Sequence, residues 1–240
     1  AGVDAVDAAM DSMSGLTSQP NLGSIAAALR GSERDTGLDQ RALTVISDYW
    51  EQARRNYAGF EPDIRAGTSS VYQHEMPGGQ YTNLRQQARS LGIEERWDDI
   101  ARTYAQVNHM FGDVIKVTPT SKVVGDMALM MVTSGLTPDD VMSPDREIAF
   151  PESAVQLFGG EMGQAYGGFP EELQKKILKG RAPLTKRPGE VLPSTDLTKA
   201  HSDADGKVGR RISDQELASY LMYPDVFVDY AKVRRTYGNI

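Results

Sequence analysis

The chain has 240 residues, enough for one large domain or two small ones. Its formal net charge of −7 argues against a general nucleic-acid-binding protein. It has no cysteine, which excludes disulfides, thiolate metal sites and cysteine nucleophiles, and its three scattered histidines do not predict a metal site. No apolar run could cross a bilayer and no signal peptide opens the chain, so we expect a soluble protein of a reducing compartment.

The first thirty residues read as one βα unit. The near-continuous apolar residues of Gly2–Met10 predict a strand that is buried on both faces, as in a parallel sheet or barrel. A loop rich in Ser, Thr, Gly and Pro follows, and then a helix is predicted over Leu22–Leu29, ended by Gly31. No further βα units follow, so we expect the unit to belong to a larger domain.

Helical patterns dominate after Asp39. Apolar residues at spacings of three and four predict one helix with Leu43, Ile46, Trp50, Ala53 and Tyr57 on its stripe, and another with Trp97, Ile100, Tyr104, Val107 and Phe111. A third helix is predicted to run to Val132, with Thr118 as its N-cap and Pro119 in its first position.

The remaining elements are shorter. Thr137-Pro138 and Pro170 each predict the start of a short helix, Ser213–Glu216 is a capping box, and Pro224 begins a last helix. Three prolines and few large apolar residues over 181–211 predict a linker or ordered loop. Within it, Asp203–Gly206 faintly resembles a calcium loop but lacks its first and last ligands, and we interpret it as a turn.

Two short segments break local rules, which is typical of functional sites. In Met76–Gln80, consecutive glycines after a proline allow close approach to the backbone, and Gln80 offers an amide; a plain turn before a helix is the alternative. In Thr118–Lys122, three hydroxyls and an ammonium crowd a helix start that already favours anions. Capping and solvation are the alternatives there. His74 beside Glu75 could form a catalytic pair, but a packed histidine is the simpler interpretation.

Four stretches carry a family resemblance: HEMPGGQYTNL, KVTPTSKVVGDMALMMV, SPDREIAFPESAV and ISDQELASYLMYPDVFVDY. They resemble the pyruvate carboxylase family, at the end of its carboxyltransferase domain and in the conserved region that follows. Related oxaloacetate decarboxylase and transcarboxylase subunits share the EMPGG motif, and the equivalent part of such a subunit is one alternative. The resemblance implies a fold between α/β and mostly α: the last βα unit of a (β/α)8 TIM barrel, followed by a predominantly helical extension.

The resemblance also implies a domain organisation. Residues 1–31 would be the terminal βα unit of the barrel, and residues 32–180 a helical extension that completes the carboxyltransferase site. Residues 181–212 would be a linker or ordered loop, and residues 213–240 would lead into a tetramerisation and allosteric region.

The activity that the resemblance implies is the biotin-dependent carboxylation of pyruvate to oxaloacetate, a ligase reaction that serves anaplerosis and gluconeogenesis. By position, Thr118 would relay a proton between pyruvate and biotin, Ser121 and Lys122 would contact the biotin ureido group, and Gln80 would line the same pocket. The alternative for this chain is an assembly or dimerisation module, with the chemistry carried upstream.

The cofactors and partners implied lie mostly outside the chain. Biotin would sit on a carrier domain, a divalent metal would be held by upstream residues, and ATP would be used at another domain. Pyruvate and carboxybiotin are the expected small-molecule partners, with a homodimer inside a homotetramer and no nucleic acid or membrane. The enzyme would be cytoplasmic in a bacterium or in the mitochondrial matrix of a eukaryote, and the fragment alone would be inactive.

Overall fold

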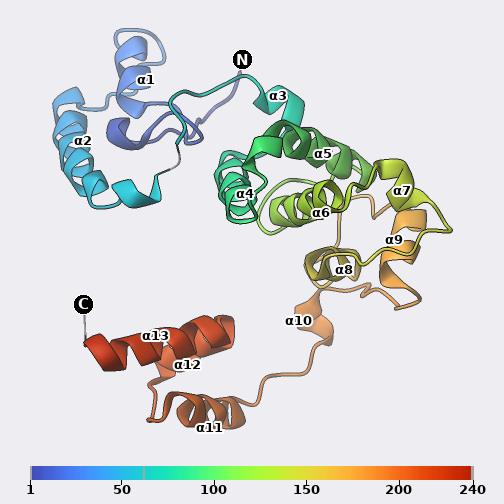
Figure 1. The fold of residues 1–240 in the computed structure, drawn as a ribbon. Coiled ribbons are helices and arrows are strands. Elements are labelled where there is room, and N and C mark those ends of the chain that lie inside the picture. The colour runs from blue at the N-terminus through green and yellow to red at the C-terminus, as the bar shows by residue number, and fades with distance from the viewer. Residues whose placement is uncertain (1, 62, 239–240) are drawn as a thin grey trace. The chain divides into compact units, whose positions relative to one another are not determined.

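Helices form nearly all the regular structure of the computed structural model, which describes residues 2–61 and 63–238 (Figure 1). The chain divides into two units, Ala1–Pro188 and Gly189–Ile240. The α-helices are α1 (Leu22–Leu29), α2 (Gln40–Arg55), α3 (Val71–His74), α4 (Gly78–Ser90), α5 (Trp97–Met110), α6 (Thr120–Ser134), α7 (Pro138–Met142), α8 (Glu152–Phe158), α9 (Glu171–Leu178), α10 (Pro188–Val191), α11 (Leu197–Val208), α12 (Asp214–Met222) and α13 (Pro224–Tyr237). Single 3-10 turns lie at Asp11–Met13, Ala58–Phe60 and Glu94–Arg96. The prediction of a mostly helical chain is therefore confirmed.

The strand predicted over Gly2–Met10 does not form within the described residues 2–10. A single parallel bridge joins Ala9 to Asn21, and Val3 and Val6 are exposed. This prediction is wrong for the present structure, because a parallel strand needs neighbouring strands to take its hydrogen bonds and cover its faces. The helix expected next does form as α1, capped by the Asn21 side chain, which accepts the Ser24 N–H (2.7 Å).

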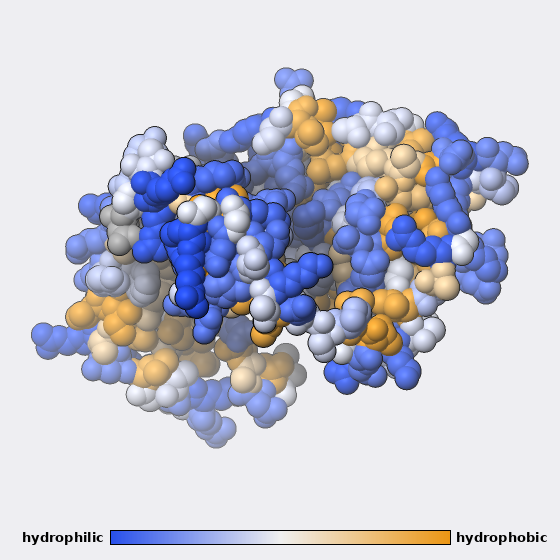
Figure 2. Space-filling view, turned by 90° about the horizontal axis from the view of Figure 1, so that it is seen from below, coloured by the Kyte–Doolittle hydropathy of each residue, from blue (hydrophilic) through white to orange (hydrophobic). Residues whose placement is uncertain are grey.

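α2 has the predicted apolar stripe, but most of the side chains on this stripe are exposed. Leu43 is buried, whereas Ile46 and Trp50 are exposed. The helix is attached to the Asp11–Met13 turn, where the Ser12 N–H donates to Ser47 Oγ (3.1 Å). The stripe therefore has little cover within the described residues, and Figure 2 shows that apolar patches interrupt the hydrophilic surface.

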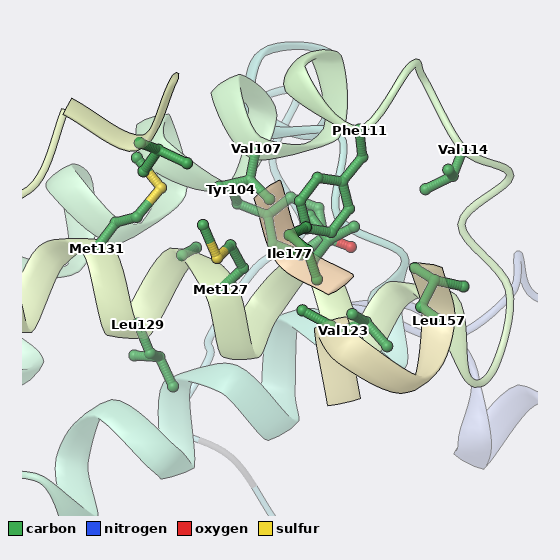
Figure 3. Packing of buried hydrophobic residues seen from close by; sticks show 14 of the residues in the cluster. Tyr104, Val107, Phe111, Val114, Val123, Met127, Leu129, Met131, Leu157 and Ile177 are labelled. Atoms are coloured by element: carbon green, nitrogen blue, oxygen red, sulfur yellow. The ribbon is translucent and has the colours of Figure 1, made fainter. Parts of the chain in front are cut away.

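The core of the first unit lies between α5 and α6, with α4, α8 and α9 packed around them (Figure 3). The predicted stripe of α5 is fully buried from Ile100 to Phe111, and Met127 and Met131 of α6 face it. Burying such side chains stabilises the fold by about 1.5–3 kcal/mol each. This packing holds the start of α6 against α5. No helix in residues 2–61 and 63–238 is both long and apolar enough to span a membrane.

The capping box predicted at Ser213 and the helix start predicted at Thr137 are both confirmed, and the start at Thr137 is a capping box as well. The Thr137 hydroxyl accepts the Asp140 N–H at the start of α7, and the Ser213 hydroxyl accepts the Glu216 N–H at the start of α12 (both 3.2 Å). α9 and α13 also begin near the prolines that predicted them. Capping depends on residues three apart, so these signals can be read from the sequence alone.

The second unit contains a helix that the sequence analysis missed. Residues 181–212 include α10 and α11, so the expectation of irregular structure is wrong over Leu197–Val208. Asp203–Gly206 is part of α11 and not a turn. The apolar face of α11 consists of small residues such as Ala204, which packs with Tyr220 and Phe227 of the following helices. Small apolar residues give a weak helical pattern, which explains the error.

Candidate active site

α6 starts two residues after Thr118, and Thr118 does not cap it. Pro119 directly precedes the first helical residue, Thr120, and no side chain caps the first turn. The Thr120 hydroxyl instead closes the preceding turn, accepting the Val117 N–H (3.2 Å) and donating to the Val117 carbonyl (2.6 Å). The predicted N-cap role of Thr118 is therefore wrong. Thr118 is exposed, and its hydroxyl makes no hydrogen bond to any residue in 2–61 or 63–238.

Ser121 and Lys122 occupy the first turn of α6, one buried and one exposed. Ser121 is 6% exposed, and its carbonyl oxygen accepts the Tyr104 hydroxyl (3.2 Å). Lys122 pairs with Asp126 one turn further along, and Asp126 also accepts the Ser153 hydroxyl (2.7 Å). The Asp126 carboxylate offsets a cation that the helix dipole disfavours at this end. The Lys122 side chain is still 58% exposed, so its ammonium remains accessible.

Gln80 packs directly onto α6. It lies in the first turn of α4, is only 7% exposed, and its amide has no hydrogen-bond partner in the described parts of the chain. Its Nε2 is 2.4 Å from the point that a Cβ on Gly125 would occupy, so the missing side chain at Gly125 makes room for it. Gly125 and Ser121 are four residues apart and share one face of α6. The structure therefore brings Gln80 and Ser121 to the same side of α6.

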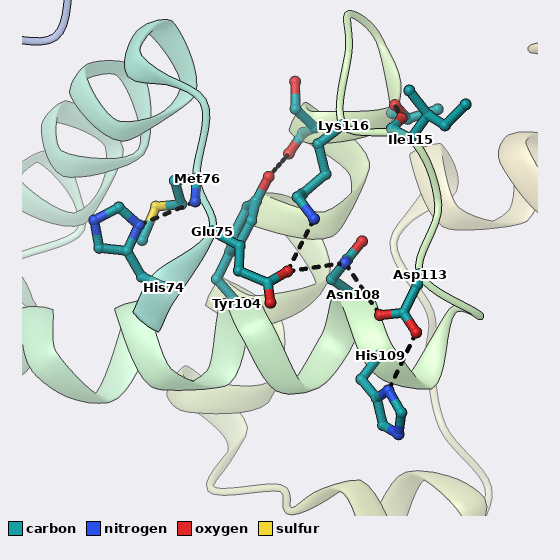
Figure 4. A network of polar contacts seen from close by, with 11 residues as sticks. His74, Glu75, Met76, Tyr104, Asn108, His109, Asp113, Ile115 and Lys116 are labelled. Atoms are coloured by element: carbon teal, nitrogen blue, oxygen red, sulfur yellow. Dashed lines mark hydrogen bonds and ion pairs between the residues drawn. The ribbon is translucent and has the colours of Figure 1, made fainter. Parts of the chain in front are cut away.

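Glu75 directly precedes the Met76–Gln80 segment, and its side chain contacts Lys116, which lies two positions before Thr118 (Figure 4). Its Oε2 accepts from Lys116 Nζ (2.9 Å) and from Asn108 Nδ2 (3.2 Å). The hydrogen bond from Lys116 is the main cause that lowers the pKa of Glu75, so the carboxylate stays ionised. The sequence analysis missed Asn108 and Lys116, because they lie 33 and 41 positions after Glu75 in the sequence.

His74 and Glu75 do not form a catalytic pair. The buried His74 accepts the Met76 N–H at Nδ1 (3.0 Å), and its ring packs 5.2 Å from the centroid of the Tyr81 ring. Figure 4 shows the Glu75 side chain directed to Lys116, away from His74. Burial lowers the pKa of His74, which favours a neutral imidazole. The packed interpretation of His74 is confirmed.

A pocket of about 220 Å³ lies beside the start of α4. Its lining includes Leu16, Thr17, Thr68, His74, Gly78 and Tyr81, but not the four residues singled out above. Gly78 is essential to this arrangement, because a Cβ there would stand 2.0 Å from the Thr17 carbonyl oxygen. The Met76–Gln80 segment is thus in close contact with the residues that follow the first, extended segment of the chain.

No group of three or more His, Asp or Glu side chains with metal-binding geometry occurs in the part of the chain that the structure describes. The two carboxylates of the Asp203–Gly206 segment are already engaged: Asp203 with Tyr220 and Lys207, and Asp205 with the Ile212 N–H (2.8 Å). Both carboxylates of this segment are therefore already satisfied by protein groups.

A family model described as "Conserved carboxylase domain" matches residues 71–240. Among curated proteins, the chain is 46% identical to the pyruvate carboxylase of Bacillus subtilis and 47% identical to that of Staphylococcus aureus, in each case over the whole chain and 21% of the relative. The chain thus spans about a fifth of the length of these relatives.

Solved structures give the same result. The chain is similar to the carboxyl transferase domain of Rhizobium etli pyruvate carboxylase with pyruvate and biocytin, at 59% identity and a TM-score of 0.91. That match covers 99% of this chain and 40% of the other. A complete multifunctional pyruvate carboxylase from the same organism matches with a TM-score of 0.89 and the same identity, over 99% of this chain and 23% of that one.

Proposed function

The chain belongs to the conserved carboxylase domain family, and on that premise we propose that it forms the biotin-facing part of the carboxyltransferase of a biotin-dependent pyruvate carboxylase. The reaction transfers CO2 from carboxybiotin to pyruvate and yields oxaloacetate. The observation that carries the proposal is the packing of the unpartnered Gln80 amide onto α6, on the side of Ser121 and beside the helix start that presents Thr118 and Lys122. The Rhizobium etli relative, whose structure holds pyruvate and biocytin, supports the choice of ligands.

The residues fit a biotin ureido group chemically. Biotin, when bound, brings the carboxyl group to the site. The Ser121 hydroxyl and the Lys122 ammonium would donate hydrogen bonds to the ureido oxygen and stabilise the negative charge that develops there. The Gln80 side chain is mostly buried and its amide has no partner among the described residues, so the amide would form its hydrogen bonds with the same ligand.

Thr118 is proposed as the proton relay. Its Oγ1 would accept a proton from the methyl group of pyruvate and pass its own proton to the ureido nitrogen, so the hydroxyl ends unchanged. A relay must be accessible and uncommitted, and the Thr118 hydroxyl is both within the described residues.

Similarity to this family supports a proposal for the other parts of the enzyme. We propose that residues 1–31 are the last βα unit of a (β/α)8 barrel, whose other strands would complete the extended segment at Gly2–Met10. The divalent metal, the biotin carrier and the ATP site would lie in other parts of the polypeptide. The enzyme would act as a dimer within a tetramer, in the bacterial cytoplasm or the mitochondrial matrix.

One observation favours an additional role in assembly. Large apolar side chains are exposed on α2 (Tyr49 and Trp50) and on α13 (Val226, Tyr230 and Val233). Exposed apolar faces of this kind usually pack against other protein. A pure assembly module would tolerate changes at Gln80 and Lys122 without loss of carboxyl transfer, which separates the two roles.

Lys122→Gln is expected to lower biotin-dependent carboxyl transfer about 10²-fold in the full-length enzyme, because one charged donor to the ureido group is lost. Bicarbonate-dependent ATP cleavage, the oligomer and the melting temperature should not change, since an exposed i,i+4 ion pair contributes little. Lys175→Gln breaks a similar pair with Glu171 in α9 and is the control. Unchanged transfer in Lys122→Gln, measured as oxaloacetate formed, would refute its role.

The isolated chain is expected to produce no oxaloacetate from pyruvate, ATP and bicarbonate. It supplies only one side of the proposed site, and the groups that bind metal and carry biotin lie elsewhere. A coupled assay of the purified 240-residue chain checks this, with the full-length enzyme as the positive control. Turnover by the isolated chain would show that the site is complete within it.

A further inference from the structure

Few side chains attach the loop between α5 and α6 to the rest of its unit. Buried side chains anchor it on both sides, at Val114 and at Val123. Between these anchors, Ile115 and Val117–Pro119 are exposed, and the Thr120 hydroxyl bonds only within the loop. Packing therefore does not fix the position of Thr118.

Lys116 is the side chain that ties this loop to another segment. Its Nζ lies 2.9 Å from Glu75 Oε2, and its side chain is only 20% exposed. Within the described residues, no other side chain between Val114 and Thr120 bonds outside the loop. The Pro119 carbonyl joins one end of the loop to α6, because it accepts the Lys122 N–H (3.1 Å) and the Val123 N–H (3.3 Å). Toward the segment of Glu75, the side-chain attachment of the loop within the described residues is this one ion pair.

Glu75 is itself held in a defined position. It adopts a left-handed conformation (φ 62°), which is unfavourable for a residue with a side chain, and Asn108 of the buried α5 face donates to its carboxylate (3.2 Å). The ion pair is partly exposed, with 46% of the Glu75 side chain accessible, so it adds little to folding stability. Stability alone does not account for a strained residue with this geometry.

We propose that Lys116 is a positioning residue that, through Glu75, fixes the segment carrying Thr118 relative to the segment carrying Gln80. This inference rests on the function proposed above. Gln80 lies five positions after Glu75 and Thr118 lies two positions after Lys116, so the pair joins the two segments close to the proposed ligand contacts. Proton transfer by Thr118 requires hydrogen-bond distance, and a displacement of about 1 Å can lower a rate about 10²-fold.

The test is Lys116→Met in the full-length enzyme. We expect kcat for pyruvate carboxylation to fall about 10²-fold. KM for pyruvate should stay within about twofold, because Lys116 acts through Thr118 and not on the substrate. ATP cleavage and the melting temperature should be retained, and Lys116→Arg should restore most of the activity by pairing with Glu75 again. Lys179→Met, which removes a pair with Glu147 (3.0 Å) far along the chain, is the matched control and should behave like the parent.

A double-mutant cycle adds a second readout. If Lys116 acts through Glu75, Glu75→Gln combined with Lys116→Met should be no slower than the slower single variant. Additive losses would overturn the coupling. A fall in melting temperature that matches the fall in kcat, with no rescue by arginine, would show a merely structural role and would also overturn it.

The inference and the proposed function can fail separately. Normal kcat in Lys116→Met, beside an inactive Thr118→Ala variant, would overturn the positioning role and leave the proposed function intact. An active Thr118→Ala variant would overturn the proton relay, and with it the reason for positioning Thr118.

Discussion

Thr118→Ala is expected to abolish pyruvate carboxylation in the full-length enzyme while leaving the fold intact. As a proton relay, the hydroxyl should contribute about 10²–10⁴ in rate. The exposed Thr118 side chain caps no helix and makes no hydrogen bond within the described residues, so its removal should change stability little. The reverse reaction, decarboxylation of oxaloacetate, shares the proton transfer and should be lost together with the forward reaction.

Two variants make this test specific. Thr118→Ser keeps the hydroxyl and should retain measurable activity, reduced by the freer rotamers of serine. Thr137→Ala removes a real N-cap, the hydroxyl that accepts the Asp140 N–H, and should cost about 1 kcal/mol of stability without affecting the chemistry. Oxaloacetate formation, ATP cleavage and thermal melting should be measured on all three variants. Carboxylation by Thr118→Ala within a few-fold of the parent would rule out the relay.

The elements that sequence could predict depend on short-range rules. The buried stripe of α5 follows from 3.6-residue periodicity, and the capping boxes at Thr137 and Ser213 involve residues three apart. Thr118 met the same local criteria, yet the first turn of α6 lies two residues later and Thr120 bonds to the loop instead. Cap residues are common, but whether one is used depends on the direction from which the chain enters the helix.

The elements that sequence missed depend on distant parts of the chain. The apolar stripe of α2 correctly predicted a helix but does not show what covers it, and the structure leaves Ile46 and Trp50 exposed within the described residues. The strand predicted over Gly2–Met10 does not form for a similar reason, since no neighbouring strand covers it within the described residues. The bond between Glu75 and Lys116 has no local pattern, and the packing of Gln80 on Gly125 depends on a glycine 45 positions further on. The sequence alone singles out Gln80 as a candidate, but it does not predict that Gln80 packs against α6.

The adjacent glycines of the Met76–Gln80 segment should respond oppositely to substitution. A Cβ at Gly78 would lie 2.0 Å from the Thr17 carbonyl oxygen and 3.1 Å from Thr17 Cβ, whereas a Cβ at Gly79 would meet nothing within 4 Å. Gly78→Ala therefore forces backbone apart, at a cost of about 1–3 kcal/mol. Gly79→Ala adds a good helix former to α4 and should stabilise it by about 0.5–1 kcal/mol.

Urea unfolding of the two variants and the parent measures this difference, and both variants should also be assayed for carboxyl transfer. Because Gly78 lies two residues before Gln80, the shift that Gly78→Ala imposes on the start of α4 should move the Gln80 amide away from α6 and lower transfer as well as stability. Gly79→Ala leaves that contact in place and should keep the activity of the parent. Equal stability and equal activity in the two variants would mean that α4 does not depend on its contact with Thr17, and that Gln80 is positioned by something other than the close approach at Gly78.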